Sequence, residues 1–175
     1  MALAACRECG AEVSVEALTC PHCGAPRPTE PGWGGTGFEW KSEATYRGYP
    51  LVHVAFGKDA RGRRRVARGV IAIGQFAVGL ITVAQFGVGL LFGFGQFILG
   101  FTALAQCAFA VYLGIGQVAT GYVAVGQVVL AYYGLAQIGL GKFLWNTQRQ
   151  DPEAVRFFQS LWDSLKPFLH WFPWA

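Results

Sequence analysis

Charge is scarce in this sequence, and one long stretch has none at all. Asp, Glu, Lys and Arg make up 14% of the 175 residues, against about 25% in ordinary globular domains. Residues 69–141 contain no Asp, Glu, Lys, Arg, His, Asn, Ser or Pro. The segment therefore lacks the residues that cover a water-facing surface and those that form loops between helices. An apolar run of this length predicts a membrane-embedded segment.

The sequence also lacks the side-chain groupings that catalysis requires. It has no Ser/His/Asp set and no phosphate-binding loop in a suitable context. His53 has no second ligand or acid spaced to work with it, so packing is the simpler interpretation of that residue. We therefore expect a protein that is not an enzyme.

Four of the five Cys residues form two Cys-x-x-Cys pairs near the N-terminus, Cys6-Arg-Glu-Cys9-Gly and Cys20-Pro-His-Cys23-Gly. Each pair can place two thiolates on one metal ion, and the Gly after each pair permits the turn. Four sulfurs complete a tetrahedral site with no open position, so we predict a structural Zn²⁺ ion. The Cys-Pro-His-Cys-Gly knuckle and the four Cys together resemble the zinc-ribbon family over residues 1–27.

The ribbon has little positive charge, since Arg7 and Arg27 are its only basic residues. Two cations are too few for a nucleic-acid footprint, so we expect the ribbon to bind a protein rather than a nucleic acid. Residues 28–40, rich in Pro and Gly, predict a linker. Residues 41–68 then predict a β-rich basic segment, in which residues 51–56 alternate like a strand and residues 57–62 form a turn.

A cluster of cations precedes the apolar stretch and predicts the orientation of the chain. Short basic flanks stay on the cytoplasmic side of a membrane. We expect the ribbon in the cytoplasm, the repeats in a bacterial inner membrane and the C-terminus on the opposite side. The start of the chain predicts no signal peptide. The cluster consists of Lys58, Arg61, Arg63, Arg64, Arg65 and Arg68.

The apolar stretch is an internal repeat marked by Gln at intervals of ten or eleven residues. With each Gln as position 0, positions −1 and +4 are always Gly or Ala, and position −3 is small in every unit. Position +2 is small except at Ile98 and Val129. The positions between these are mostly large and apolar. The Gln residues are Gln75, Gln85, Gln96, Gln106, Gln117, Gln127 and Gln137.

This spacing favours strands over helices. Small residues spaced three, two, three and two apart would fall all around a helix and form no packing stripe. In an extended chain the same spacing is an alternation whose phase resets every five residues, as at a corner. We predict a mainly β chain whose repeats, residues 69–144, form a membrane-embedded β-solenoid with a Gly/Ala interior and an apolar exterior. Three transmembrane helices are the alternative.

Seven coils stacked at about 4.8 Å would rise about 34 Å, which matches a hydrocarbon core of about 30 Å. Gln side chains one coil apart could form a ladder of amides. The alternative use of the Gln residues is a polar track across the membrane.

Residues 151–175 predict an amphipathic helix that lies at the membrane interface, followed by an aromatic tail. Asp151 and Pro152 form a helix start, and Pro167 is expected to end the helix. The apolar stripe consists of Val155, Phe158, Leu161, Trp162 and Leu165.

Residues 49–141 resemble uncharacterised bacterial membrane proteins with short Gly-rich repeats, which implies a fold but no activity. The first functional hypothesis is a non-enzymatic membrane protein that presents a cytoplasmic zinc ribbon to a protein partner. Copies of the same chain are a second candidate partner. The alternatives are a channel or transport component that uses the Gln residues, and a membrane-tethered nucleic-acid binder that uses the ribbon and residues 58–68.

Overall fold

The computed structural model describes residues 2–169 of the chain. The predicted aromatic tail begins at Phe168, and its residues 170–175, which include His170, lie outside the described residues. Strands dominate the rest, so the prediction of a mainly β chain is confirmed. The elements in order are β1 (Leu3–Ala5), β2 (Glu12–Ser14), β3 (Gly37–Lys41), β4 (Thr45–Tyr46), β5 (Tyr49–Pro50), β6 (Val52–Gly57), β7 (Val66–Trp145) and α1 (Pro152–Leu169).

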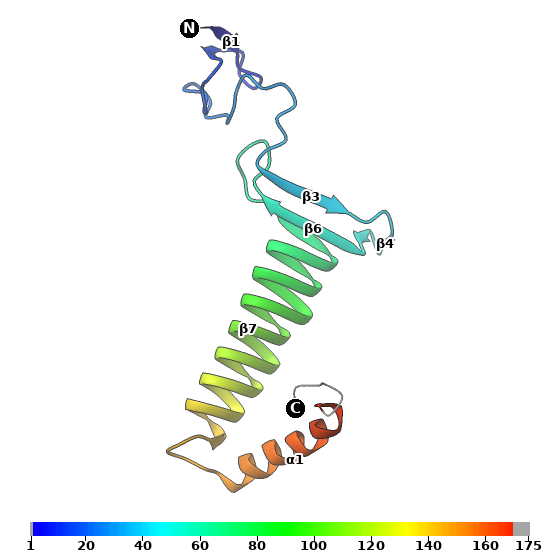
Figure 1. Cartoon of the computed structure of the whole chain (residues 1–175), viewed down its shortest axis with the longest axis vertical. Helices are drawn as coiled ribbons and strands as arrows, with labels where there is room; N and C mark the ends of the chain where they lie inside the picture. The colour runs from blue at the N-terminus through cyan, green and yellow to red at the C-terminus, as the bar shows by residue number, and fades with distance from the viewer. Residues whose placement is uncertain (1, 170–175) are drawn as a thin grey trace.

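The small elements cluster at the N-terminal end of β7 (Figure 1). β1 and β2 pair antiparallel within the ribbon. β3 pairs antiparallel with β6, and β6 pairs parallel with β7, from Val52 beside Ile71 to Ala55 beside Gly74. β6 therefore occupies the place of a coil above the first repeat, and β3 covers its outer edge. Residues 37–40 belong to this sheet rather than to the expected linker, because Phe38, Glu39 and Trp40 pair with β6.

β7 is a single 80-residue strand that winds as a spiral of short coils (Figure 1). Residues ten or eleven positions apart lie one above the other. A Cβ atom built on Gly116 would overlap the carbonyl oxygen of Ala105, eleven residues earlier, and one built on Gly126 would overlap that of Gly116, ten residues earlier. Each coil thus corresponds to one Gln-marked repeat. No helix in residues 2–169 is both long and apolar enough to cross a membrane.

Small residues fill the interior of the spiral, and two rows of them are buried along almost its whole length, with residues of positions −1 and +4 such as Ala84 and Ala110 adding to the core. All seven residues at position −3 are buried, as are all at position +2 except Gly139. The −3 row is Ala72, Thr82, Gly93, Ala103, Gly114, Ala124 and Gly134, and the +2 row is Ala77, Gly87, Ile98, Ala108, Ala119, Val129 and Gly139.

The larger interior residues face glycines across the spiral. Ile98 is fully buried, and a Cβ atom on Gly93 would overlap its Cγ2. Thr82 lies against Gly87 in the same way, at 2.6 Å from the built Cβ, and its hydroxyl donates to the carbonyl oxygen of Val88 at 2.9 Å. The departures from Gly and Ala are therefore matched in volume by the residue opposite, which keeps the interior densely packed.

The outer surface of the spiral carries the large apolar side chains. Aromatic rings stack from coil to coil, with centroids 5.5 Å apart for Phe76 and Phe86 and 5.0 Å apart for Tyr122 and Tyr132. The exposed fraction reaches 59% at Leu90, 72% at Val111 and 73% at Leu140. This apolar exterior continues to the end of the repeats, because the alternation directs every second residue, usually a large one, away from the interior.

α1 runs back beside the last coils of the spiral instead of closing its end (Figure 1). Ala154 and Phe158 are buried against the outer side chains of these coils, including Val123. Of the predicted apolar stripe, Leu161, Trp162 and Leu165 remain 41–56% exposed, because a cavity of about 830 Å³ separates them from the spiral. The end of the spiral is covered by the turn before α1, where Trp145 bridges Gln150.

Both ends of α1 can be compared with the sequence. The carbonyl oxygen of Asp151 accepts the N–H of Val155 at 3.0 Å, so the helix starts at the predicted residue. The expectation that Pro167 ends the helix is wrong, since α1 extends to Leu169. Pro removes a single backbone hydrogen bond in the last turn, and this loss does not break a helix that is about to end.

Candidate metal centre

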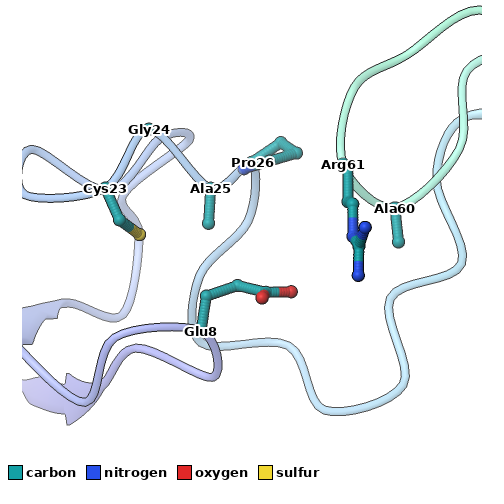
Figure 2. A pocket seen from close by; sticks show the side chains of 7 residues that line it. All are labelled: Glu8, Cys23, Gly24, Ala25, Pro26, Ala60 and Arg61. Atoms are coloured by element: carbon teal, nitrogen blue, oxygen red, sulfur yellow. The ribbon is translucent and has the colours of Figure 1, made fainter.

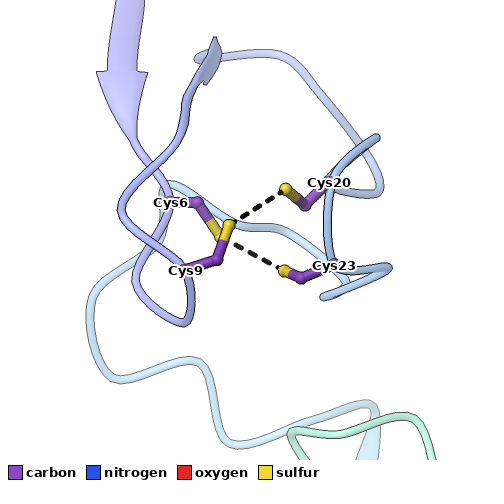
Figure 3. A group of neighbouring side chains, drawn as sticks. All are labelled: Cys6, Cys9, Cys20 and Cys23. Carbon is purple, nitrogen blue, oxygen red and sulfur yellow. Dashed lines mark hydrogen bonds between the residues drawn. The ribbon is translucent and has the colours of Figure 1, made fainter.

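The four cysteines of the ribbon lie together although they come from two separate turns (Figure 3). Cys6 and Cys9 flank the turn after β1, and Cys20 and Cys23 flank a second turn. In each turn a Gly with positive φ accepts the reversal of the chain, Gly10 at 73° and Gly24 at 74°. A non-Gly residue would be strained at these angles.

The arrangement of the sulfur atoms fits one tetrahedral zinc ion. Cys6 Sγ lies 3.7 Å from Cys23 Sγ, and Cys9 Sγ lies 3.7 Å from Cys20 Sγ. All four sulfurs are within 4.8 Å of one another. Zinc–sulfur bonds of about 2.3 Å imply sulfur–sulfur distances of about 3.8 Å in a regular tetrahedron. The predicted structural Zn²⁺ ligands are therefore positioned as the metal requires.

The local electrostatics supports thiolate formation at one of these residues. The backbone N–H groups of Cys9 and Glu8 lower the pKa of Cys6 to about 6. The backbone N–H of Ala25 also favours a thiolate at Cys23, but desolvation and the neighbouring thiols outweigh it and raise the pKa of Cys23 to about 12. Four thiolates in so small a volume repel one another, so a divalent cation is the natural counterion.

The core of the ribbon is too small to hold it folded without the metal. Its buried residues are Cys6, Val13, Cys20 and Ala25. Two of these four are the zinc ligands themselves. His22 lies between the ligands Cys20 and Cys23 and is exposed, as four sulfurs already complete the site. The ion consequently supplies the folding free energy that the core cannot, and it has no open position for a substrate.

The ribbon contacts the loop between β6 and β7, residues 58–65. The guanidinium of Arg7 donates to the carbonyl oxygens of Arg27 and Ala60, both at 3.0 Å. A pocket of about 230 Å³ remains between the two parts, with Glu8 and Cys23 on the ribbon side and Arg61 on the loop side (Figure 2). Arg7 is thus a structural bridge.

The predicted basic cluster lies at the junction of the ribbon, β6 and the first coil. Arg65 forms an ion pair with Glu39 and donates to the carbonyl oxygen of Gly34 at 2.6 Å. Arg63 forms an ion pair with Asp59 at 3.0 Å. Lys58, Arg61, Arg64 and Arg68 have no carboxylate partner within residues 2–169. Among the described residues, four of the six cations in the cluster therefore remain without a neutralising carboxylate beside the first apolar coil.

The seven Gln residues lie on the outer surface of the spiral. Six are exposed, and Gln75 is half-buried. No hydrogen bond between two of their amides is present in the described part of the chain, so the amide ladder remains a prediction. The alternation of small and large residues predicts which positions face the interior, but it does not predict on which side the Gln side chains lie.

His53 is the functional candidate that the sequence did not reveal. It is 4% exposed, and its Nδ1 accepts the backbone N–H of Arg68 at 2.8 Å. Its Nε2 is buried without a hydrogen-bond partner, although Glu39 Oε1 lies 3.3 Å away. The sequence could not indicate this, because Glu39, His53 and Arg68 come together only through the β3–β6–β7 sheet.

Comparison with known proteins identifies one part of the chain. The pattern of the zinc-ribbon domain matches residues 6–27, which include all four cysteines. No curated protein and no solved structure matches the chain. The comparison therefore supports the zinc centre and does not extend to β7.

Proposed function

We propose that this chain is a non-enzymatic integral membrane protein, in which β7 is a membrane-spanning β-solenoid that presents a cytoplasmic zinc ribbon to a protein partner. The observation that carries the proposal is the apolar exterior of β7. Large side chains such as Phe94, Leu104 and Tyr122 are 37–49% exposed along its length. Soluble monomers rarely expose a contiguous apolar surface of more than a few hundred Å².

The distribution of charge supports the same proposal. Arg64 and Arg68 lie at one end of the repeats, and Lys142 and Arg149 at the other, with no charged residue from 69 to 141. Seven coils span about 34 Å, close to a hydrocarbon core of about 30 Å. The excess of cations at the ribbon end favours a cytoplasmic ribbon in a bacterial inner membrane.

The backbone of β7 meets the main requirement of a bilayer. Polar backbone groups need partners inside the protein wherever lipid replaces water. Each coil lies on the one before it, β3 and β6 cover the first coil, and the turn at residues 146–151 covers the last. The exposed edges of the stack would thus lie at the level of the headgroups.

The ribbon offers a surface for a protein partner. Leu3, Val15 and Leu18 are 61%, 45% and 74% exposed, although they belong to a domain with hardly any core. The nucleic-acid alternative has less support, because Arg7 is engaged as a bridge and Arg27 pairs with Glu30 at 2.6 Å. A second copy of the chain is the other partner that the apolar exterior of β7 could accommodate.

The channel alternative rests on the Gln residues and receives less support. Buried small residues fill the interior, and six of the seven Gln side chains are exposed on the outer surface. Replacing Gln96 and Gln106 with Leu separates the two functions. The anchor predicts unchanged membrane insertion and no lost flux in liposomes, whereas the loss of a specific conductance would support the channel.

Membrane integration is tested by expressing the full-length chain in bacteria and extracting the membranes with alkaline carbonate. We expect the protein to stay in the membrane pellet and to require detergent for solubilisation. Infrared spectroscopy of the detergent-solubilised protein should show a predominantly β amide I band. Recovery of a folded protein in the soluble fraction without detergent would contradict the proposal.

The position of α1 gives the proposal a second test. In this structure Asp163 and Lys166 form an ion pair at 2.7 Å beside the last coils, where lipid would surround them at a high desolvation cost. We expect α1 to leave the spiral in a bilayer and to lie among the headgroups, as its amphipathic sequence predicts. Asp163→Cys in a zinc-loaded Cys107→Ser background should then react with a polar maleimide, whereas Leu91→Cys should not.

A further inference from the structure

A second candidate site lies where β3, β6 and the start of β7 meet. A cavity of about 740 Å³ opens there, which we call the junction pocket. Five cationic side chains line it against the carboxylates of Glu39 and Asp59, an excess of three positive charges. The cationic residues are Lys41, Arg63, Arg64, Arg65 and Arg68.

The ion pairs within the pocket leave two of these cations free. Glu39 is held by Lys41 at 2.9 Å and by Arg65, and Asp59 is held by Arg63. Lys41 and Arg65 together lower the pKa of Glu39, with the hydrogen bond from Lys41 as the largest cause. Within the described residues, Arg64 and Arg68 have no carboxylate partner. The positive charge available to a ligand therefore comes from these two guanidinium groups.

A buried donor without a partner also lines the junction pocket. Nδ1 of His53 accepts the backbone N–H of Arg68 at 2.8 Å, which leaves a proton on Nε2, and this N–H has no hydrogen-bond partner among the described residues. A buried N–H without an acceptor costs free energy, and an acceptor from a ligand would recover it. The carboxylate of Glu39, 3.3 Å away, does not make this hydrogen bond and is already neutralised by two cations.

We propose that the junction pocket binds a phosphate group, with Arg64 and Arg68 supplying paired N–H donors and His53 Nε2 a third. Guanidinium groups bind phosphate oxygens in bidentate geometry more strongly than neutral donors do. A phosphate is tetrahedral and presents several acceptor oxygens, so it can satisfy donors that converge from different strands.

The location of the pocket indicates where such a phosphate would come from. The guanidinium carbon of Arg64 lies 5.3 Å from the centre of the Phe76 ring, which belongs to the first apolar coil. Val66, also in the lining, is 36% exposed. Cations directly above an apolar surface suit an anionic phospholipid, whose headgroup phosphate joins an apolar tail. This assignment to a lipid rests on the proposed membrane insertion, but the binding of phosphate itself does not.

The test is isothermal titration of the full-length, zinc-loaded protein in a non-ionic detergent. The two probes are dihexanoyl phosphatidylglycerol and inorganic phosphate, and a single-stranded oligonucleotide is titrated separately as a competing class of ligand. We expect the lipid to bind, with the double variant Arg64→Gln/Arg68→Gln weakening its affinity by about tenfold or more. Arg61→Gln is the matched control, because Arg61 belongs to the same loop but does not line the junction pocket. Its affinity should be that of the unmodified protein.

Each outcome of the titration has a defined meaning. Inorganic phosphate that binds as tightly as the lipid, with the same loss in the double variant, identifies free phosphate as the ligand and keeps the site. Equal weakening by Arg61→Gln means diffuse charge attraction and overturns the proposal. Binding of a single-stranded oligonucleotide, with neither probe bound, overturns it in favour of a nucleic acid.

A spectroscopic measurement checks the histidine independently. In protein labelled with nitrogen-15 at histidine, addition of the bound probe should shift the Nε2 resonance of His53 and leave that of His22 unchanged. No shift at saturating probe would remove His53 from the site. Carbonate extraction tests membrane insertion separately, so a failure of the anchor and a failure of the phosphate site are distinguishable.

Discussion

The ribbon and the spiral both fold without a conventional hydrophobic core, and they do so in opposite ways. In the ribbon, stability is concentrated in four sulfur atoms around one ion. In the spiral, it is distributed over the backbone of an 80-residue strand and two rows of small interior residues. A chain can thus replace a core by one strong centre or by many equivalent close approaches. The two solutions should therefore fail differently.

The largest expected effect is the removal of zinc. Zinc binding contributes on the order of 10 kcal/mol to small metal-dependent domains, so a chelator or Cys20→Ser should unfold residues 2–27 completely. β7 should keep its structure, because none of its residues contributes to the metal site. Limited proteolysis should show cleavage within the ribbon and a protected fragment from β3 onward. Loss of the β signal in infrared spectra on chelation would contradict this independence.

The next effect concerns the close approach between coils. A side chain on Gly116 would overlap the carbonyl oxygen of Ala105, whereas Ile115 points outward and is 38% exposed. Gly116→Leu should prevent folding or cost more than about 4 kcal/mol, while Ile115→Leu should cost less than about 1 kcal/mol. Denaturant titration in detergent, followed by infrared spectroscopy, measures both. Similar midpoints for the two variants would argue against the stacked coils.

A smaller effect tests the matched volumes inside the spiral. Gly93→Ala should destabilise, because the added methyl group overlaps Ile98, and Ile98→Ala should leave a cavity that costs about 2–5 kcal/mol. The double variant should be more stable than Ile98→Ala alone, since the methyl group added at position 93 fills part of the cavity. A coupling energy of about 0.5–3 kcal/mol is expected from the double-mutant cycle. Strict additivity would show that the two side chains do not meet.

The smallest expected effect concerns Glu39, which lies in β3 between the ribbon and the spiral. The pKa of Glu39 is lowered by hydrogen bonding to Lys41 and Arg65, so its ionised form stabilises the fold above the unfolded value near 4.5. That contribution is lost as the pH falls through the lower folded value. Glu39→Gln should cost less than about 1 kcal/mol at neutral pH. It should also flatten the dependence of the free energy of unfolding on pH between about pH 5 and 3. If the variant and the unmodified protein lose stability in the same way at acid pH, Glu39 does not contribute to the stability of the fold.

The sequence was most informative where one residue type repeats. The Cys-x-x-Cys spacing predicted the metal ligands, and the alternation of small and large residues predicted β structure and the buried −3 and +2 positions. Ile98 and Val129 looked like exceptions to the interior pattern. Each of them packs against a glycine five residues away in sequence, Gly93 for Ile98 and Gly134 for Val129. This pairing depends on the closed coil, which the linear pattern does not display.

The remaining features depend on contacts that no local pattern encodes. β3 begins within a Gly-rich segment that predicted a linker, because its partner is β6. α1 buries Ala154 and Phe158 against the spiral, although its apolar stripe continues to Leu165. The junction pocket combines Glu39, His53 and Arg68 from three strands. In each case the decisive partner lies on another element of the fold.

The parallel pairing of β6 with the first coil has a consequence for how the chain reaches its native state. Each coil finds its hydrogen-bonding partner about ten residues earlier, so every step of growth closes only a short loop. β6 is synthesised before β7 and presents the first edge on which a coil can form. The chain can therefore fold from its N-terminal side as it is made, with each finished coil acting as the template for the next. A shift of the register by one residue would bring large side chains into the interior. A non-native register that keeps the small residues inside would therefore have to be shifted by a complete repeat.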